Sequence, residues 1–387
     1  MSSEPKSSRY SQTEKQEVSS SERKLEEQME YPTGLKLGLI TLALCLSVFL
    51  VSLDNTIIAT AIPKITDQFD SLDDVGWYGS SYLLTTAAFQ LFYGRLYSLL
   101  SMKWVFMGAI SIFELGSLIC GVAPNSKALI VGRAVAGLGS AGILSGAFVI
   151  IAHAVPMGKR PMYTGIIGAM YGIASVAGPL LGGVSAVQSG IDNLPLILSL
   201  VISMIIAGAV TSAVGYYTPF MILSSILMSV GAGLLSTLTV TIGHADWIVF
   251  QIVFGMGVGC GAQQSIMAVQ TVLSREDVAS GTALINLMQT LGGALFVSVG
   301  ENVFTNKLVS GLVSQVPSVD PAIVLSAGAT SLQSVINPEL LPAVLLVYNQ
   351  ALMSAFYVSI AMGALSLVGS GAMEWRSIKG KNVEIVG

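Results

Sequence analysis

Long apolar stretches separated by short polar segments run along most of the chain. A helix crosses the roughly 30 Å hydrocarbon core of a bilayer in about 20 residues, and ten of the stretches are that long. We predict spans at 36–60, 76–99, 104–123, 128–151, 163–183, 194–214, 218–239, 247–271, 280–304 and 341–372. The short alternating segments of a membrane β-barrel are missing from this pattern, and a single segment in lipid satisfies its own backbone only as a helix. The prediction is an all-α, polytopic membrane protein.

The composition excludes most other classes of protein. Of 387 residues, 53% are hydrophobic and only 10% are charged, and the mean hydropathy is +0.74. An ordinary soluble domain carries roughly 25% charged residues, so we expect neither a soluble enzyme nor a disordered chain. The net charge of −4 gives no basic excess with which to bind nucleic acid. The partner that this composition predicts is the lipid bilayer.

The positions of Lys and Arg predict which way the spans point, because basic residues accumulate in cytoplasmic segments. With the N-terminus placed in the cytoplasm, fourteen of the 18 basic residues lie inside, three lie outside and Arg133 lies within a span. Both termini are therefore predicted to be cytoplasmic. The predicted organisation is a disordered cytoplasmic tail (1–34), a five-helix bundle (35–183), a short outer loop (184–193), a second five-helix bundle (194–373) with a long outer loop at about 305–340, and a cytoplasmic tail (374–387).

Motifs for catalysis, metal binding or cofactor binding do not emerge from the sequence. The three cysteines lie singly in apolar stretches, which favours packing over a metal site. The G-x-G-x-x-G pattern at 137–142 lies inside a predicted span, where small residues let helices approach closely. We therefore predict no enzyme activity, no metal and no cofactor.

Charged residues inside spans are costly in lipid and usually face a partner or a watery cavity. Asp54 lies about 27 Å above Lys36 at helical rise, and Arg133 lies five residues into a span that enters from outside. Their similar depth allows an ion pair or a shared polar cavity, with a role either in transport or in fixing helix packing. Glu114 lies near mid-membrane, either as a protonatable group or as a hydrogen-bonded structural acid.

Taken together, the motifs of this sequence resemble those of the major facilitator superfamily, and within it those of the fungal drug and toxin efflux pumps of about fourteen helices. The resemblance rests on Leu-Asp-Asn-Thr-Ile-Ile at 53–58, the Gly94–Arg95 loop that runs to Lys103, the Arg133 motif from 129 to 137, and the fifth-span series Gly168, Gly172, Gly178, Pro179, Gly182 and Gly183. It implies two helix bundles around a central cavity and efflux of a small amphipathic or hydrophobic compound by proton antiport. Asp54 and Glu114 are then the candidate proton carriers, and Arg133 tunes them.

Six amide side chains inside the spans are plausible linings of a substrate pocket. They serve equally well as hydrogen bonds between helices, and the sequence leaves both interpretations open. The six are Gln90, Gln263, Gln264, Asn286, Gln289 and Asn349.

One departure from the family pattern is large. After Gly183 the sequence passes to what resembles the approach to the tenth family helix, so about four helices are missing and the fold is a reduced one. The alternative to a transporter is a truncated membrane protein that is degenerate or modulates a full-length partner. The plasma membrane is the expected location, the vacuolar membrane is the alternative, and the oligomeric state is left open.

Overall fold

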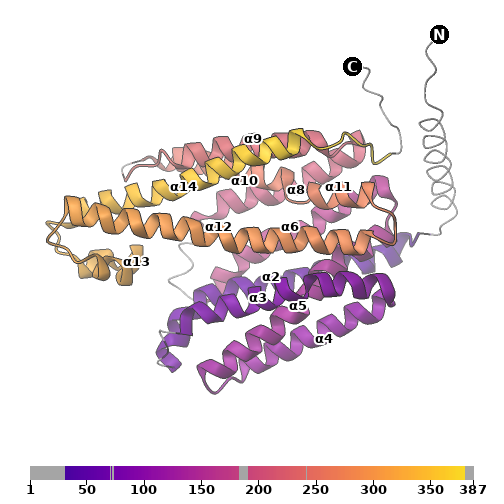
Figure 1. Ribbon diagram of the computed structural model, residues 1–387, viewed down its shortest axis with the longest axis horizontal. Helices are drawn as coiled ribbons and strands as arrows, with labels where there is room; N and C mark the ends of the chain where they lie inside the picture. The colour runs from indigo at the N-terminus through magenta and orange to yellow at the C-terminus, as the bar shows by residue number, and fades with distance from the viewer. Residues whose placement is uncertain (1–30, 70, 72–73, 183–190, 241, 380–387) are drawn as a thin grey trace, which may run out of the picture.

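Long helices running side by side make up this computed structural model, which describes residues 31–69, 71, 74–182, 191–240 and 242–379 (Figure 1). The first group contains α2 (Gly34–Phe69), α3 (Val75–Leu99), α4 (Met102–Gly121), α5 (Ser126–Ala154), the short 3-10 helix η2 (Met157–Lys159) and α6 (Arg160–Gly182). The second group contains α8 (Leu194–Val214), α9 (Thr218–Leu235), α10 (His244–Gly261), α11 (Gln264–Val272), α12 (Val278–Gln315), α13 (Pro321–Val335) and α14 (Leu341–Gly371).

The described residues contain eight helical segments that are long and apolar enough to cross a membrane, with α10 and α11 counted as one segment. The helices α3 and α6 are not among these eight, but both are long, so each of the ten predicted spans corresponds to a helix or to a helix pair. The all-α, polytopic class is confirmed. We call the end that carries Arg95, Lys103, Lys159, Arg160 and Arg275 the basic end.

Small residues bring the helices of the first group into close contact. The most buried span is α5, and the G-x-G-x-x-G pattern lies within it. A Cβ atom on Gly142 would lie 2.6 Å from the Cβ of Ala109 in α4, and one on Gly139 would collide with the main chain of Phe113. The pattern therefore serves helix packing, as predicted.

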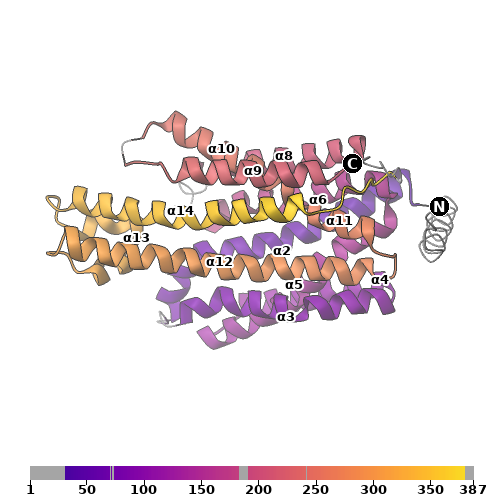
Figure 2. The same cartoon turned by 45° about the horizontal axis from the view of Figure 1, so that its top comes forward.

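The predicted outer loop at 305–340 is wrong, because most of it is helical. Helix α12 continues to Gln315, and α13 forms a further helix before α14. Leu308 and Leu312 of α12 pack with residues of α13 and α14 in a second hydrophobic core. Figures 1 and 2 show this unit projecting beyond the ends of the other helices. An apolar face buried against α13 and α14 keeps α12 helical beyond the length that a bilayer requires.

Two further boundaries differ from the prediction. Helix α2 does not end near residue 60 but continues through Pro63 to Phe69. The predicted span at 247–271 is interrupted, since α10 ends at Gly261 and α11 begins at Gln264. A break inside a span frees backbone groups that must find other partners.

The start of the predicted C-terminal tail packs on the protein. The Ile378 amide donates to the Gly215 carbonyl at 2.9 Å, and Gly215 has the left-handed φ of +96° that ends α8. Ile378 is buried in the main hydrophobic core. Burial also raises the pKa of the nearby Tyr217 hydroxyl, which donates to the Glu374 carbonyl. The 1–30 part of the predicted N-terminal tail lies outside the described residues.

Candidate functional site

An ion pair joins two of the predicted charges, in the half of the bundle away from the basic end. The Arg133 Nη1 atom of α5 donates to the Asp54 Oδ2 atom of α2 at 2.5 Å. The Arg133 side chain is only 2% exposed, whereas the Asp54 side chain is 23% exposed. Helical rise predicted similar depths for Asp54 and Arg133, and in the structure their side chains are in contact. The Asp54 carboxylate is therefore partly exposed, whereas the Arg133 guanidinium is buried.

Helix α3 supplies the rest of the arginine's surroundings. Arg133 Nε donates to the Tyr78 carbonyl at 3.0 Å, and the guanidinium lies 4.3 Å from the centre of the Tyr82 ring. An aromatic face attracts a cation, especially where water is excluded. Arg133 Nη2 and the Tyr82 hydroxyl are buried without a hydrogen-bond partner. The cluster therefore holds the charge firmly but leaves these two polar groups unpaired.

A chain of hydrogen bonds continues from this cluster toward the end opposite the basic end. The Tyr78 hydroxyl shares a hydrogen bond of 2.6 Å with Ser71 and donates to Ser126 at 2.9 Å. Ser126 in turn donates to the Asp74 carboxylate. The link from Tyr78 through Ser126 to Asp74 could not be predicted from the sequence, because it depends on how α3 is rotated.

The fifth-span glycines that the structure describes lie in α6 and face α8, α2 and, at Gly168, the side chain of Gln263. A Cβ on Gly172 would lie 2.5 Å from Val201 in α8, and one on Gly168 would lie 2.6 Å from Met204 in the same helix. Gly178 instead faces α2, where its Cβ would lie 2.7 Å from the Cβ of Thr56, two residues beyond Asp54. The Thr56 hydroxyl also donates to the Ala174 carbonyl at 3.2 Å. Pro179 and Gly182 fall within α6, and Gly183 lies outside the described residues.

The loop motif near the basic end brings the two helix groups together. A Cβ on Gly94 of α3 would lie 2.6 Å from the Cβ of Ala283 in α12, so the two helices meet closely there. Ser98 adds a bond of 3.3 Å to the Glu276 carbonyl. Arg95 is exposed, and Lys103 lies 5.5 Å from the centre of the Trp104 ring. Gly94 is thus the residue of this motif that makes the contact between helices, whereas the Arg95 and Lys103 side chains lie at the surface.

The structure divides the six predicted amides into two kinds. Asn349 donates to the Leu238 carbonyl at 2.9 Å and Gln289 to the Ala262 carbonyl at 3.1 Å, so these two tie the backbone together. The other four each carry a buried polar atom without a partner, and we call them the interior amides: Gln90, Gln263, Gln264 and Asn286. Gln270, which we did not single out, has the same character, since its nitrogen reaches the Phe148 carbonyl at 3.3 Å while its oxygen is unpaired.

Two of the interior amides lie at the break between α10 and α11. Gln263 precedes the first residue of α11, Gln264, and the side-chain oxygen of each is unpaired. The carbonyl of Ala262, which the break frees, is the one that Gln289 satisfies. Interrupted membrane helices with polar groups at the break are a common basis for substrate sites in transporters.

The remaining interior amides come from α3 and α12, the helices that meet at Gly94. Gln90, four residues before Gly94, is fully buried and donates to Ser145 of α5 at 3.3 Å. Asn286 lies three residues after Ala283 and is 6% exposed. Because α3 and α12 run in opposite directions, both amides lie one turn from the contact, on the same side of it.

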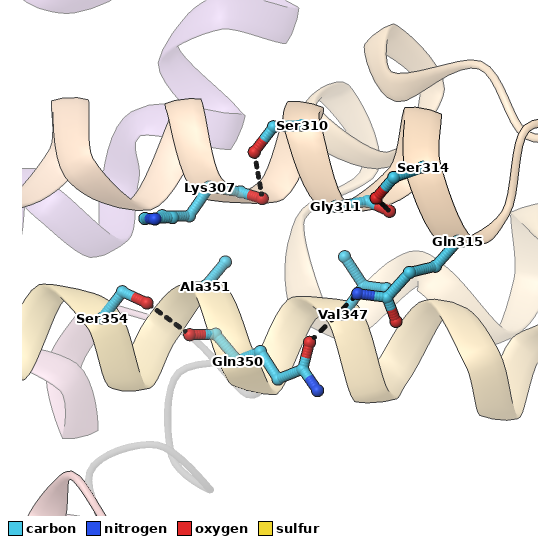
Figure 3. A pocket seen from close by; sticks show the side chains of 9 residues that line it. All are labelled: Lys307, Ser310, Gly311, Ser314, Gln315, Val347, Gln350, Ala351 and Ser354. Carbon is cyan, nitrogen blue, oxygen red and sulfur yellow. Dashed lines mark hydrogen bonds between the residues drawn. The ribbon is translucent and has the colours of Figure 1, made fainter.

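Glu114 lies apart from all of these groups. Its side chain is exposed on α4, and within the described residues it makes no hydrogen bond or ion pair. A groove of about 500 Å³ also lies elsewhere, between α12 and α14 beside the projecting unit. Figure 3 shows Lys307, Gln315 and Gln350 along this groove, which contains none of the predicted site residues.

Comparison with known proteins identifies the family. A family model described as Major Facilitator Superfamily matches residues 44–202. The MFS-type efflux pump MFS1 of Arthroderma benhamiae is 42% identical over 508 residues, covering 92% of this chain and 95% of the relative. The efflux pump aflT of Aspergillus parasiticus is 39% identical over 498 residues, covering 90% and 97%. The chain belongs to the major facilitator superfamily, a family of membrane transporters rather than enzymes.

Solved structures give the same fold. The proton:xylose symporter XylE bound to 6-bromo-6-deoxy-D-glucose superimposes with a TM-score of 0.58 at 10% identity, covering 88% of this chain and 97% of that chain. A bacterial homologue of the human lysosomal transporter Spinster, in an inward-facing and unoccupied conformation, has a TM-score of 0.53 at 15% identity, covering 91% and 100%.

The relatives are longer than this chain. The alignment with the Arthroderma pump runs over 508 positions but contains only 92% of the 387 residues of this chain, so roughly 150 residues of the relative have no counterpart here. With roughly 30 residues for a span and its connection, that difference corresponds to four or five helices. The predicted join, which follows Gly183, lies outside the described residues.

Proposed function

We propose that this chain exports a small amphipathic or hydrophobic compound across the membrane by proton antiport. The observation that carries the proposal is the break between α10 and α11, where Gln263 and Gln264 present unpaired oxygens inside an apolar bundle. Relatives at about 40% identity are named efflux pumps, which supports the direction of transport. A transported compound with a hydrogen-bond donor and an apolar body matches such a site.

The interior amides are the proposed substrate contacts. An unsatisfied buried amide costs free energy, and a ligand or a water molecule that pairs with it recovers that cost. Gln90 and Asn286 come from α3 and α12, which approach each other closely at Gly94 near the basic end. A change in that approach would move these two amides relative to Gln263 and Gln264, as alternating access requires.

The Asp54–Arg133 pair is the proposed coupling element. Protonation of Asp54 removes one partner of the pair and leaves the guanidinium with the Tyr78 carbonyl and the Tyr82 ring. This change in pairing gives a proton a means to favour one arrangement of α2 against α5. We keep Asp54 as the proton carrier in preference to Glu114, because Glu114 contacts none of these groups.

The test of export is a comparison of accumulation in cells. Yeast depleted of its own drug exporters would express the chain, and retention of the amphipathic dye rhodamine 6G would be measured at matched membrane abundance. We expect lower retention than with empty vector, and loss of that difference in the Arg133→Ala variant. Proteoliposomes with and without an imposed pH gradient then test the coupling. Retention equal to that of empty vector would favour the non-transporting alternative.

The shortened length gives a second comparison. We expect the chain to transport less well than a version that carries the missing segment of a relative after Gly183, because alternating access needs a cavity walled on every side. Equal efflux by the two forms, lost in both with Arg133→Ala, would show that the reduced architecture works.

The proposed location is the plasma membrane, with both termini in the cytoplasm. Lys127 and Lys159 are surface residues at opposite ends of the α5 region. Cysteines that replace them should react with an impermeant thiol reagent from opposite sides of the membrane, Lys127→Cys from outside and Lys159→Cys only after permeabilisation. Labelling of both from one side would contradict the orientation, and a tagged chain at the vacuole would contradict the location.

A further inference from the structure

Helix α4 carries an acidic side chain on the face that points away from the rest of the bundle. Glu114 lies about 18 Å from Met102 and about 10 Å from Gly121 along the helix, well inside the membrane. It is exposed, and no described residue pairs with it. Figure 1 shows α4 at the edge of the first group, where it packs mainly on α5. A lone carboxyl group that faces lipid is costly and calls for a partner outside the chain.

The surroundings of Glu114 are those of a helix–helix seam. One row of exposed side chains on α4 recurs every three or four residues, which is the spacing of a seam between two parallel helices. The row is Trp104, Met107, Ser111, Glu114 and Leu118, and Lys103 and Leu115 are exposed beside it. Gly108 has nothing within 4 Å of where a Cβ would lie, so another backbone can approach there. Ser111 donates to its own helix at 3.0 Å and keeps an oxygen free to accept.

We propose that this face binds a second copy of the chain, in a two-fold dimer whose α4 helices pair at Glu114. A two-fold axis along the membrane normal sets each α4 residue opposite its own copy. A carboxylic acid both donates and accepts, so Glu114 is self-complementary: one copy donates its proton to the carboxyl group or to Ser111 of the other. Polar pairs of this kind hold membrane helices together and fix their register. The inference is independent of the proposed export, because its test counts subunits.

The test measures dimerisation of the full chain in liposomes. Fluorescently tagged chain would be reconstituted over a range of protein-to-lipid ratios, and subunits counted by single-molecule photobleaching. We expect Glu114→Leu to weaken the dimer about fivefold or more. Glu114→Gln, which keeps a donor and an acceptor, should weaken it less than about twofold. Glu301 is an exposed acid on α12, and Glu301→Leu is the matched control that should leave the dimer unchanged.

A second measurement serves if the leucine variant folds poorly. Ser111→Cys should form an oxidative cross-link between copies, whereas Ser298→Cys, on the exposed face of α12, should not exceed the parent chain with its three native cysteines. Three results would each overturn the proposal: a monomer at every density, a Glu114→Leu dimer as tight as the parent, or equal cross-linking at both positions.

Discussion

The Asp54–Arg133 cluster and the interior amides are both polar groups inside apolar spans, yet the protein treats them in opposite ways. The ion pair has a partner at almost every position, from the Asp54 carboxylate to the Tyr78 carbonyl and the Tyr82 ring. Gln90, Gln264 and their two companions each keep an unpaired atom. The two sets are separated along α5, because Arg133 precedes Ser145, the partner of Gln90, by about 18 Å.

The contrast distinguishes two uses of polarity in a membrane. A charge is too costly to leave without a partner, so the fold supplies the partner and the pair becomes part of the architecture. A neutral amide costs less, so the fold can leave it unpaired for a ligand. Stability should therefore depend on the first set, and substrate affinity on the second.

The largest expected effect is that of Arg133→Ala. Removing one partner of a buried pair leaves the other uncompensated, and we expect a loss of about 3 kcal/mol in the free energy of unfolding, together with loss of transport. Arg133→Lys should recover only part, because an ammonium group lacks the planar fork that reaches both Asp54 and the Tyr78 carbonyl. Unfolding in denaturing detergent would measure the stability change.

A double variant serves as the control for that loss. Arg133→Leu combined with Asp54→Leu removes both charges, so stability should return to within about 1 kcal/mol of the parent while transport stays absent. Transport by the double variant would remove the coupling role from the pair. Full stability of the single alanine variant would remove its architectural role.

The next largest effect concerns the contact that positions two of the amides. Gly94→Val places side-chain atoms where Ala283 already lies, and we expect a loss of about 2 kcal/mol through overpacking, with weaker transport. Gly94→Ala with Ala283→Gly exchanges the methyl group between α3 and α12, and should retain most of the stability and transport. If Gly94→Val alone behaves like the parent, closeness at the basic end is not needed.

These contacts also show what the sequence could and could not predict. Helical rise fixes depth, so the sequence alone placed Asp54 level with Arg133. Rotation about the helix axis is not fixed in this way, and the Tyr82 ring, the Tyr78 link and the outward direction of Glu114 were all missed for that reason. The extension of α12 was missed because span length was judged by bilayer thickness, although Leu308 and Leu312 show the spacing of a helix that packs.

The helix break gave a weaker signal. A glycine series from Gly255 to Gly261 precedes two adjacent glutamines, which indicates a polar interruption, but the apolar run continues across it and reads as one span. Which amides would be paired was beyond the sequence altogether. Gln289 and Gln264 are the same residue type in neighbouring spans, and only the position of the Ala262 carbonyl separates their roles.

A matched pair of substitutions tests that separation directly. Gln264→Met removes an amide whose oxygen has no partner, so stability should be unchanged or slightly higher, while substrate affinity falls. Gln289→Met removes the bond to the Ala262 carbonyl and should cost about 1 kcal/mol of stability, with a smaller change in affinity. The test measures the transport KM and the free energy of unfolding for each of the two variants. The reverse pattern would exchange the two roles.

The smallest expected effect lies within the ion-pair cluster itself. The Tyr82 hydroxyl is buried without a hydrogen-bond partner, so Tyr82→Phe keeps the ring over Arg133 and removes only an unsatisfied group. We expect a change in the free energy of unfolding of less than about 0.5 kcal/mol, and near-parental transport. Tyr78→Phe is the matched control, because its hydroxyl bonds to Ser71 and Ser126, and its loss should cost about 1 kcal/mol. A large loss of transport in Tyr82→Phe at unchanged stability would show that this hydroxyl waits for a ligand, as the interior amides do. Tyr82 would then belong to the ion-pair cluster by position but act as the interior amides do, and the two sets of polar groups would not have separate roles.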